Sequence, residues 1–251
     1  AWRCCPTGLR ISERNFLLVS SIIVGVSVGL VAVALKKAVH AIQFWLRELF
    51  RGHDWQYLYY LLPLIGILIT VFYVQKIRKG KIGRGISGII QSISKRHGNI
   101  PPDNMYSHMV SSAVTVGFGG SVGLEAPIVI TGSAVGSNIA RVFLLSQKER
   151  VVLLACGAAA GIAAVFNTPV AGVLFAMEVL LAEFSIPTFI PILIASASGA
   201  VISRLLYNEH LFYLLTKEWQ IDAIPFYLLL GGLCGLVSVY FMRVYFWTEK
   251  K

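Results

Sequence analysis

The chain has 251 residues, of which 56% are hydrophobic and only 14% are charged, with a formal net charge of +10. Soluble domains carry roughly 25% charged residues, so a soluble fold of this composition would leave large apolar patches facing water. The composition excludes a conventional soluble enzyme and a disordered segment, and it indicates an integral membrane protein.

Long uncharged runs predict the membrane-spanning helices, because a helix needs roughly 20 largely apolar residues to cross a bilayer. These runs occupy residues 15–35, 55–75, 105–124, 151–177, 184–203 and 223–242. The first run is expected to continue as an amphipathic helix through Lys36 and Lys37 to about Phe50. Residues 126–140 are too short for a comfortable span.

The run at residues 151–177 is too long for one span and is interrupted by Asn167, Thr168 and Pro169. Proline disfavours helix at the preceding residue, so two helices are expected to meet there. We therefore expect about eight or nine helices, several of them short or broken, in a single transmembrane domain over residues 1–251.

Basic residues are concentrated in the segment 76–96, which contains seven lysines and arginines and no acid. Cytoplasmic loops carry an excess of Lys and Arg, so this segment is predicted to be cytoplasmic. Two predicted helices precede it, which places the N-terminus on the same side. The same rule accounts for the net positive charge without a nucleic-acid partner.

Four pairs of glycines spaced four residues apart predict close contacts between helices, because small residues let helix backbones approach in lipid. The pairs are Gly25/Gly29, Gly132/Gly136, Gly157/Gly161 and Gly231/Gly235. Residues 157–164 are almost all small, so their helix is expected inside the bundle.

The segment that carries chemistry is residues 117–130, in which four glycines precede Glu125 and Pro127. The glycines allow the backbone to unwind, and proline fits the first turn of a new helix. The free N–H groups of that turn, near Ile128 and Val129, carry the positive end of the helix dipole. A helix that begins inside a membrane in this way is predicted to bind an anion.

Glu125 lies at the start of this predicted helix. An ionised carboxylate is costly in a bilayer interior, so its presence there indicates a functional site. The carboxylate can occupy the place of the anion and be displaced when it takes a proton. The alternative is a carboxylate that only caps the helix or lies at the membrane surface.

Residues 83–178 resemble the CLC family of chloride channels and proton-coupled chloride transporters. The gate motif of that family, Gly-x-Glu-Gly-Pro, corresponds to residues 123–127, and the match continues through residues 132–136, 157–161, 166–169 and 171–178. The resemblance implies an all-α membrane fold of broken and tilted helices built from inverted repeats. This chain would cover the first repeat plus one helix of the second.

The resemblance identifies Glu125 as the gating residue. It also implies which residues surround the anion, and they fall in two segments. They are Gly123, Ala126, Ile128 and Val129 beside the gate, and Arg84, Gly85 and Ile86 in the loop that aligns with the Gly-Ser-Gly-Ile-Pro loop of the family.

Arg84 and Ser87 stand where that loop has its serine and its proline. The guanidinium of Arg84 could bind the anion with a charge and several donors. It could equally extend to cytoplasmic headgroups, as long basic side chains do.

The paired glutamates of proton-coupled members align with Glu178 and Val179, and the proton-delivering position falls on Val179. A valine cannot relay protons, so we expect a passive, channel-like pathway unless Glu183 or water replaces the missing group. Glu178 either takes part in transport or pairs with a basic neighbour at a helix end.

The resemblance implies transport of chloride or another small anion by a multi-pass membrane protein that forms a homodimer. The Gly-x-Phe-x-Pro loop and pore tyrosine of the second repeat have no counterpart, so we expect the sequence to be partial. Three alternatives stay open: a proton-coupled antiporter, a fluoride-selective member, and a non-conducting half-repeat subunit. The sequence has no nucleophile with a base, no phosphate-binding glycine loop and no metal-ligand spacing, so no enzymatic activity, cofactor or metal is expected.

Overall fold

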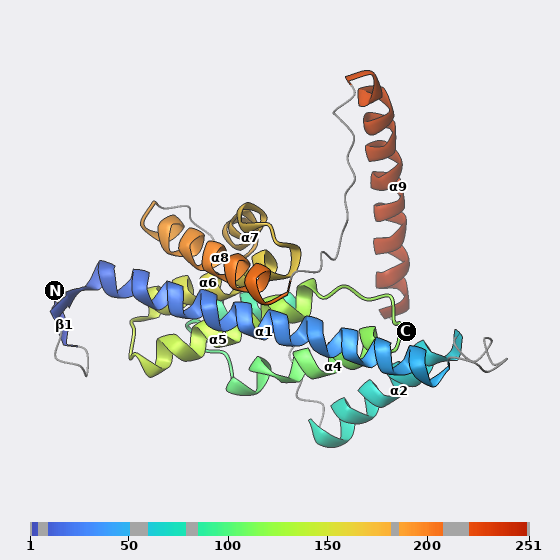
Figure 1. Ribbon diagram of the computed structural model, residues 1–251. Helices are drawn as coiled ribbons and strands as arrows, with labels where there is room; N and C mark the ends of the chain where they lie inside the picture. Colours follow the sequence, from blue (N-terminus) through green and yellow to red (C-terminus); the bar gives the residue numbers. More distant parts are fainter. Residues whose placement is uncertain are drawn as a thin grey trace. The chain divides into compact units, whose positions relative to one another are not determined.

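The computed structural model describes residues 2–4, 10–50, 60–78, 85–181, 186–207 and 221–249 (Figure 1). The chain divides into two compact units, residues 1–209 and residues 210–251. Each unit is considered by itself below. The predicted single transmembrane domain over the whole chain stays a prediction.

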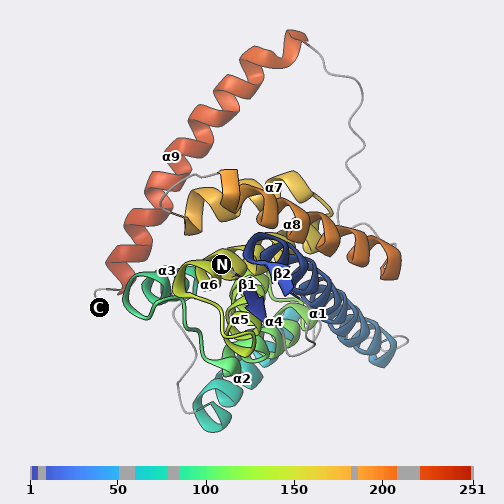
Figure 2. The same cartoon turned by 90° about the vertical axis from the view of Figure 1, so that its left-hand side faces the viewer.

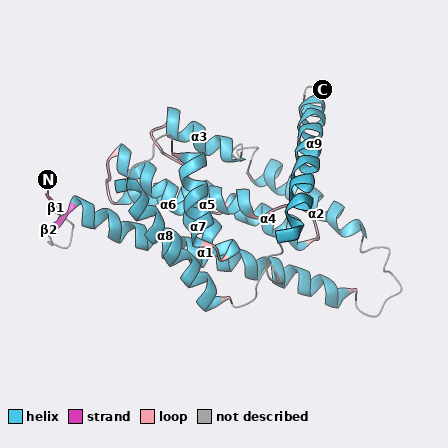
Figure 3. Cartoon of the chain, turned by 90° about the horizontal axis from the view of Figure 1, so that it is seen from above, coloured by secondary structure: helices cyan, strands magenta, loops and turns pink. Residues whose placement is uncertain are grey.

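The described part of the first unit is almost entirely helical, as the view from above shows (Figure 3). Its α-helices are α1 (Glu13–Leu49), α2 (Leu62–Phe72), α3 (Gly85–Lys95), α4 (Ser107–Gly117), α5 (Glu125–Val142), α6 (Gln147–Phe166), α7 (Pro169–Phe175) and α8 (Ile186–Leu206). Short π- and 3₁₀-helical segments are η2 (Tyr73–Ile77), η3 (Pro102–Met105) and η4 (Ala176–Leu180). Two strands, β1 (Trp2–Cys4) and β2 (Arg10–Ser12), pair antiparallel ahead of α1. The predicted all-helical class is confirmed for the described residues, except for this two-stranded sheet.

Helix α6 is the centre of the first unit. It packs against α1, α5, α7 and α8, and the end-on view shows it between α5 on one side and α7 and α8 on the other (Figure 2). All of its residues from Val152 to Val165 are buried. The prediction that this small-residue helix lies inside the bundle is confirmed.

Three of the four glycine pairs lie where two helix backbones meet. A Cβ on Gly132 would collide with the carbonyl oxygen of Gly157, and a Cβ on Gly157 would collide with that of Gly132, so α5 and α6 touch through their backbones. Helix α1 approaches α8 in the same way, because a Cβ on Gly29 would lie 2.9 Å from the carbonyl oxygen of Gly199. Around Gly231 and Gly235 of the second unit, by contrast, a Cβ would meet no atom within 4 Å among the described contacts.

Four described helices are long and apolar enough to cross a membrane: Asn15–Leu49, Gln147–Phe166, Pro187–Leu206 and Ile224–Thr248. They coincide with predicted runs, and the first extends to residue 49 as expected. The predicted break after residue 166 is also confirmed, because α6 ends at Phe166 and α7 begins at Pro169. Ser196 of α8 donates to the carbonyl oxygen of Pro169 at 2.6 Å and so fixes the start of α7.

The prediction of one span over residues 105–124 is wrong. Helix α4 has 11 residues, which rise about 16 Å against the roughly 30 Å of a bilayer core. The helix ends in a Schellman motif in which Gly120 N–H donates to Thr115 at 2.9 Å and Gly119 N–H donates to Val116 at 3.0 Å. Gly119 has φ +88°, a left-handed conformation that favours glycine. An uncharged run does not continue as helix through such a position.

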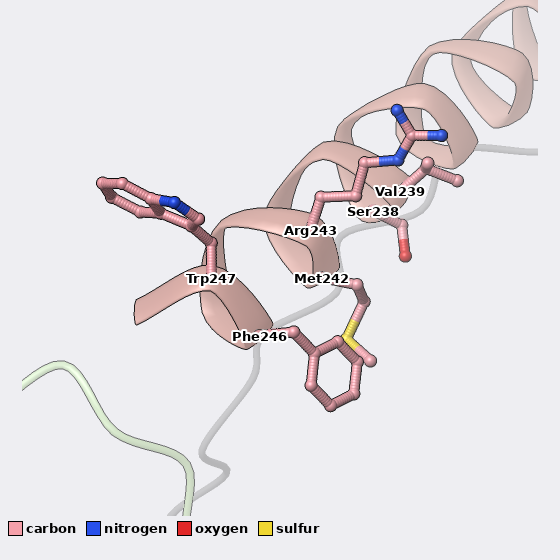
Figure 4. A pocket seen from close by; sticks show the side chains of 6 residues that line it. All are labelled: Ser238, Val239, Met242, Arg243, Phe246 and Trp247. Atoms are coloured by element: carbon pink, nitrogen blue, oxygen red, sulfur yellow. The ribbon is translucent and has the colours of Figure 1, made fainter. Parts of the chain in front are cut away.

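The second unit contains η5 (Ile221–Ala223) and α9 (Ile224–Glu249). Its large apolar side chains, such as Leu228 and Phe241, are exposed in the described structure. A pocket of about 500 Å³ lies along its last turns. The side chains that line it all belong to α9 and are labelled in Figure 4: Ser238, Val239, Met242, Arg243, Phe246 and Trp247. None of them belongs to the predicted site.

Candidate functional site

The gate candidate Glu125 is the first residue of α5, and its side chain is exposed in the described structure. A Cβ on Gly123 would collide with Oε2 of Glu125, so the carboxylate lies back over the backbone of residue 123. Only glycine leaves room for this arrangement. The carboxylate therefore lies beside the amino end of its own helix, where the helix dipole favours negative charge.

The predicted set of free amides near the gate needs one correction. The N–H of Ile128 donates to the carbonyl oxygen of Leu124 at 3.1 Å, so it is not free. Val129, one residue further along, belongs to the same helical ladder. Pro127 has no N–H, so the amides that precede the first intrahelical bond are those of Glu125 and Ala126. The reason is that α5 begins two residues before Pro127, whereas proline was expected at the helix start.

Three predicted site residues from separate segments meet in one apolar cluster. Val129 of α5 is fully buried in this cluster. Ile86 of α3 and Val179 of η4 are partly buried and pack against the cluster. The cluster also contains Ile89 and Leu180, so the buried side of Val179 packs against apolar residues.

A second cluster contains Ile128, which packs with Leu35 of α1 and Ala164 of α6, with Leu124 at its edge. Phe166, the last residue of α6, packs against both clusters. Phe166 was not among the predicted site residues. The sequence feature that could have indicated Phe166 is its place just before the break between α6 and α7. At this break Asn167 adopts a left-handed φ of +59°.

The remaining predicted residues divide by position. Arg84 and Glu183 lie outside the described residues. Gly85 begins α3 with φ +58°, a conformation that explains a glycine at this place. Glu178 is exposed on η4.

A polar group of residues fixes the loop between α3 and η3 to α5. Ser137 donates to the carbonyl oxygen of Gly98 at 2.6 Å and accepts from the N–H of Ile100 at 3.1 Å. Asn138 donates to the carbonyl oxygen of Ile100 at 3.3 Å. The partners are almost 40 residues apart in the chain, which is why the sequence did not indicate them.

Arg78, at the end of η2, forms an ion pair with Asp103 at 3.0 Å and donates to the hydroxyl of Tyr106 at 3.3 Å. Burial lowers the pKa of Arg78, but the hydrogen bond and the charge of Asp103 outweigh it, so the pKa lies above its ordinary value. The guanidinium is charged in any case. This contact joins the predicted cytoplasmic segment to the start of α4.

Comparison with known proteins agrees with this arrangement. A family profile described as "Voltage gated chloride channel" matches residues 65–251. The chain belongs to this family, the CLC family.

Among its relatives, "Chloride channel protein CLC-e" of Arabidopsis thaliana is 31% identical over 92% of the chain and 35% of its own length. The "H(+)/Cl(-) exchange transporter ClcA" of Yersinia pestis is 29% identical over 93% of the chain and 51% of its own length. A solved "CLC-type fluoride/proton antiporter" superimposes with a TM-score of 0.72 at 28% identity, over 90% of this chain and 56% of that one. The chain thus spans between about a third and just over a half of the length of these relatives. It is a multi-pass integral membrane CLC protein.

Proposed function

We propose that this CLC chain supplies one half of a membrane pathway for chloride or another small anion, with Glu125 as the gate. The observation that carries the proposal is the carboxylate of Glu125 lying over Gly123 at the amino end of α5. In this position it competes with an anion for the same positive end of a helix.

The gating step follows from the charge of the carboxylate. When Glu125 is ionised, the dipole of α5 attracts it, and it occupies the anion's place. When it takes a proton it loses that attraction, and an anion can replace it beside the amides of Glu125 and Ala126. Gly85, Ile86 and Arg84 are proposed to form the cytoplasmic side of the same path.

We propose that the pathway is channel-like rather than proton-coupled. Support comes from Val179, which offers no titratable group at the proton-delivering position and packs among apolar neighbours. Relatives named as proton antiporters favour the alternative, a proton-coupled antiporter for chloride or fluoride. A homodimer is part of the same proposal, and a half-repeat subunit that does not conduct is the competing one.

The test is ion flux through the natural gene product in liposomes, with a chloride electrode and a pH electrode recording together. We expect wild-type flux to rise as pH falls and Glu125→Gln to remove most of that pH dependence, because the variant side chain is neutral at every pH. The matched control is Glu48→Gln, an exposed carboxylate on α1 outside the predicted site, which should keep the wild-type profile. A Glu125→Gln profile identical to wild type at every pH would exclude Glu125 as the gate.

The same recordings decide between the alternatives. Chloride flux without proton movement supports a channel, and opposed proton movement supports an antiporter. Competition between fluoride and chloride gives the selectivity. Flux no faster than in protein-free liposomes would favour the non-conducting subunit.

A further inference from the structure

Lys36 is a buried lysine within the membrane-spanning helix α1. Only 7% of its surface is exposed, whereas the neighbouring Lys37 is exposed. A buried charge is costly unless it is paired and hydrogen-bonded. The burial of Lys36 needs a reason that the gate at Glu125 does not supply.

The ammonium group of Lys36 connects three helices. Nζ donates to the carbonyl oxygen of Ala164 in α6 at 2.8 Å and to Oγ of Ser203 in α8 at 3.2 Å. Ser203 itself donates to the same carbonyl oxygen at 2.6 Å. The ring of Tyr207 completes the surroundings, with its centre 5.4 Å from Nζ. In the described part of the chain no carboxylate is found as a partner of this lysine.

The charge of Lys36 is only partly compensated. Ala164 lies in the last turn of α6, where carbonyl groups lack intrahelical donors and carry the negative end of the helix dipole. That end is equivalent to roughly half an elementary charge. Among the described residues, this helix end offsets about half of the lysine charge, and the ring of Tyr207 adds a favourable contact.

The end of α6 that holds the ammonium group shares an apolar cluster with the first turn of α5. Ala164, which accepts the hydrogen bond from Lys36, packs in one cluster with Leu35 and with Ile128 in the first turn of α5. The amino end of α5 is also positive. The two positive contributions add at the place where Glu125 and an anion compete.

We propose that Lys36 is a positioning residue whose charge raises the affinity of the α5 amino end for a small anion, while its hydrogen bonds hold the last turn of α6. The inference deepens the proposed function, since it concerns the same anion site. It assigns to α1 a part in anion binding.

The test measures chloride binding by titration calorimetry on the natural gene product in detergent, after exchange into a large organic anion. This readout does not depend on transport. Lys36→Met removes the charge at similar length, Lys36→Arg keeps it, and Lys37→Met is the matched control one residue away. We expect Lys36→Met to raise the chloride Kd about three- to tenfold, as loss of a partly compensated charge would. Lys36→Arg and Lys37→Met should keep the wild-type Kd.

A Lys36→Met variant with the wild-type Kd would overturn the inference, and so would a wild-type protein that binds no chloride.

Ser203→Ala separates charge from packing, because it removes one hydrogen bond and leaves the ammonium group. It should lower the melting temperature without changing the Kd, and a Kd shift equal to that of Lys36→Met would contradict a role of charge. If Lys36→Met does not fold, Lys36→Gln replaces it, since the amide can still donate to Ala164.

Failure of this inference can be told from failure of the proposed gate. An unchanged pH profile in Glu125→Gln with a raised Kd in Lys36→Met removes the gate and keeps the anion site. The opposite pair of results keeps the gate and removes Lys36.

Discussion

Replacing Gly157 by alanine tests the contact on which the first unit depends, the packing of α5 on α6. A Cβ on residue 157 would lie 2.6 Å from the carbonyl carbon of Gly132 and 3.3 Å from the nitrogen of Ser133, and closer still to the carbonyl oxygen of Gly132. All three atoms are backbone atoms inside α5, so no side chain can turn aside. The added methyl group must push the two helices apart.

The size of the effect follows from these distances. Ordinary contacts begin near 3.4 Å, so the helices must separate locally by about 1 Å, which forfeits much of the attraction between close-packed atoms. Overpacking costs about 1–3 kcal/mol, and a clash with backbone belongs near the upper end. Alanine regains about 0.5–1 kcal/mol because it is a better helix former than glycine. The expected net loss is about 2 kcal/mol, or a fall in Tm of about 4–8 °C for a chain of this size.

The assay is thermal unfolding of the 251-residue chain in detergent, followed by tryptophan fluorescence. Gly231→Ala is the control, because among the described residues of its own unit a Cβ there meets no atom within 4 Å, so the substitution should leave Tm unchanged or slightly higher. A Gly157→Ala chain that melts at the wild-type temperature would refute the reasoning. Equal losses in both variants would also refute it, because they would reflect glycine itself and not the helix contact.

Two further predictions concern the ends of helices. Gly123→Ala should displace the Glu125 carboxylate, which is the end of a flexible side chain. We expect an altered pH profile of anion flux and a loss of stability below about 1 kcal/mol. A wild-type flux profile would show that the position of the carboxylate over Gly123 has no part in gating. Ser146 caps α6 in a capping box with Glu149, accepting from its N–H at 3.5 Å while Glu149 Oε2 accepts from Ser146 N–H at 2.9 Å. Ser146→Ala should therefore cost about 1 kcal/mol of stability in thermal unfolding. Thr168→Ala should cost less, because Thr168 forms no side-chain cap on α7, and equal losses in the two variants would contradict the capping role.

The sequence predicted those parts of the fold that local chemistry decides. Charge and hydropathy located α1, and Pro169 located the break between α6 and α7. The length of α4 was overestimated because hydropathy does not register the left-handed conformation of Gly119. The prediction of a free amide at Ile128 was wrong for a similar reason. Backbone hydrogen bonds, and not the place of Pro127 alone, decide which residue begins α5.

The candidate site was predictable where one segment carries it and not where distant segments meet. Glu125 and Gly123 are two residues apart, and their relation could be read from the glycine-rich stretch. The partners of Lys36 lie 128 and 167 residues further along the chain, so nothing near Lys36 distinguishes it from the exposed Lys37. Phe166 likewise acquires its place between two clusters only when α1, α3, α5 and η4 come together.

The two serines of α8 have a consequence for the order in which the protein assembles during synthesis. Ser203 and Ser196 donate to the carbonyl groups of Ala164 and Pro169, on either side of the break between α6 and α7. Both acceptors leave the ribosome before their donors do. Until α8 is inserted, the carbonyl group of Ala164 has only Lys36 of α1 as its described donor, and the carbonyl group of Pro169 has no side-chain donor among the described residues. Lipid cannot replace the two missing serine hydrogen bonds. A nascent chain that stops before Ile186 should therefore hold the start of α7 less firmly, and the arrival of α8 should complete the hydrogen bonds around the break.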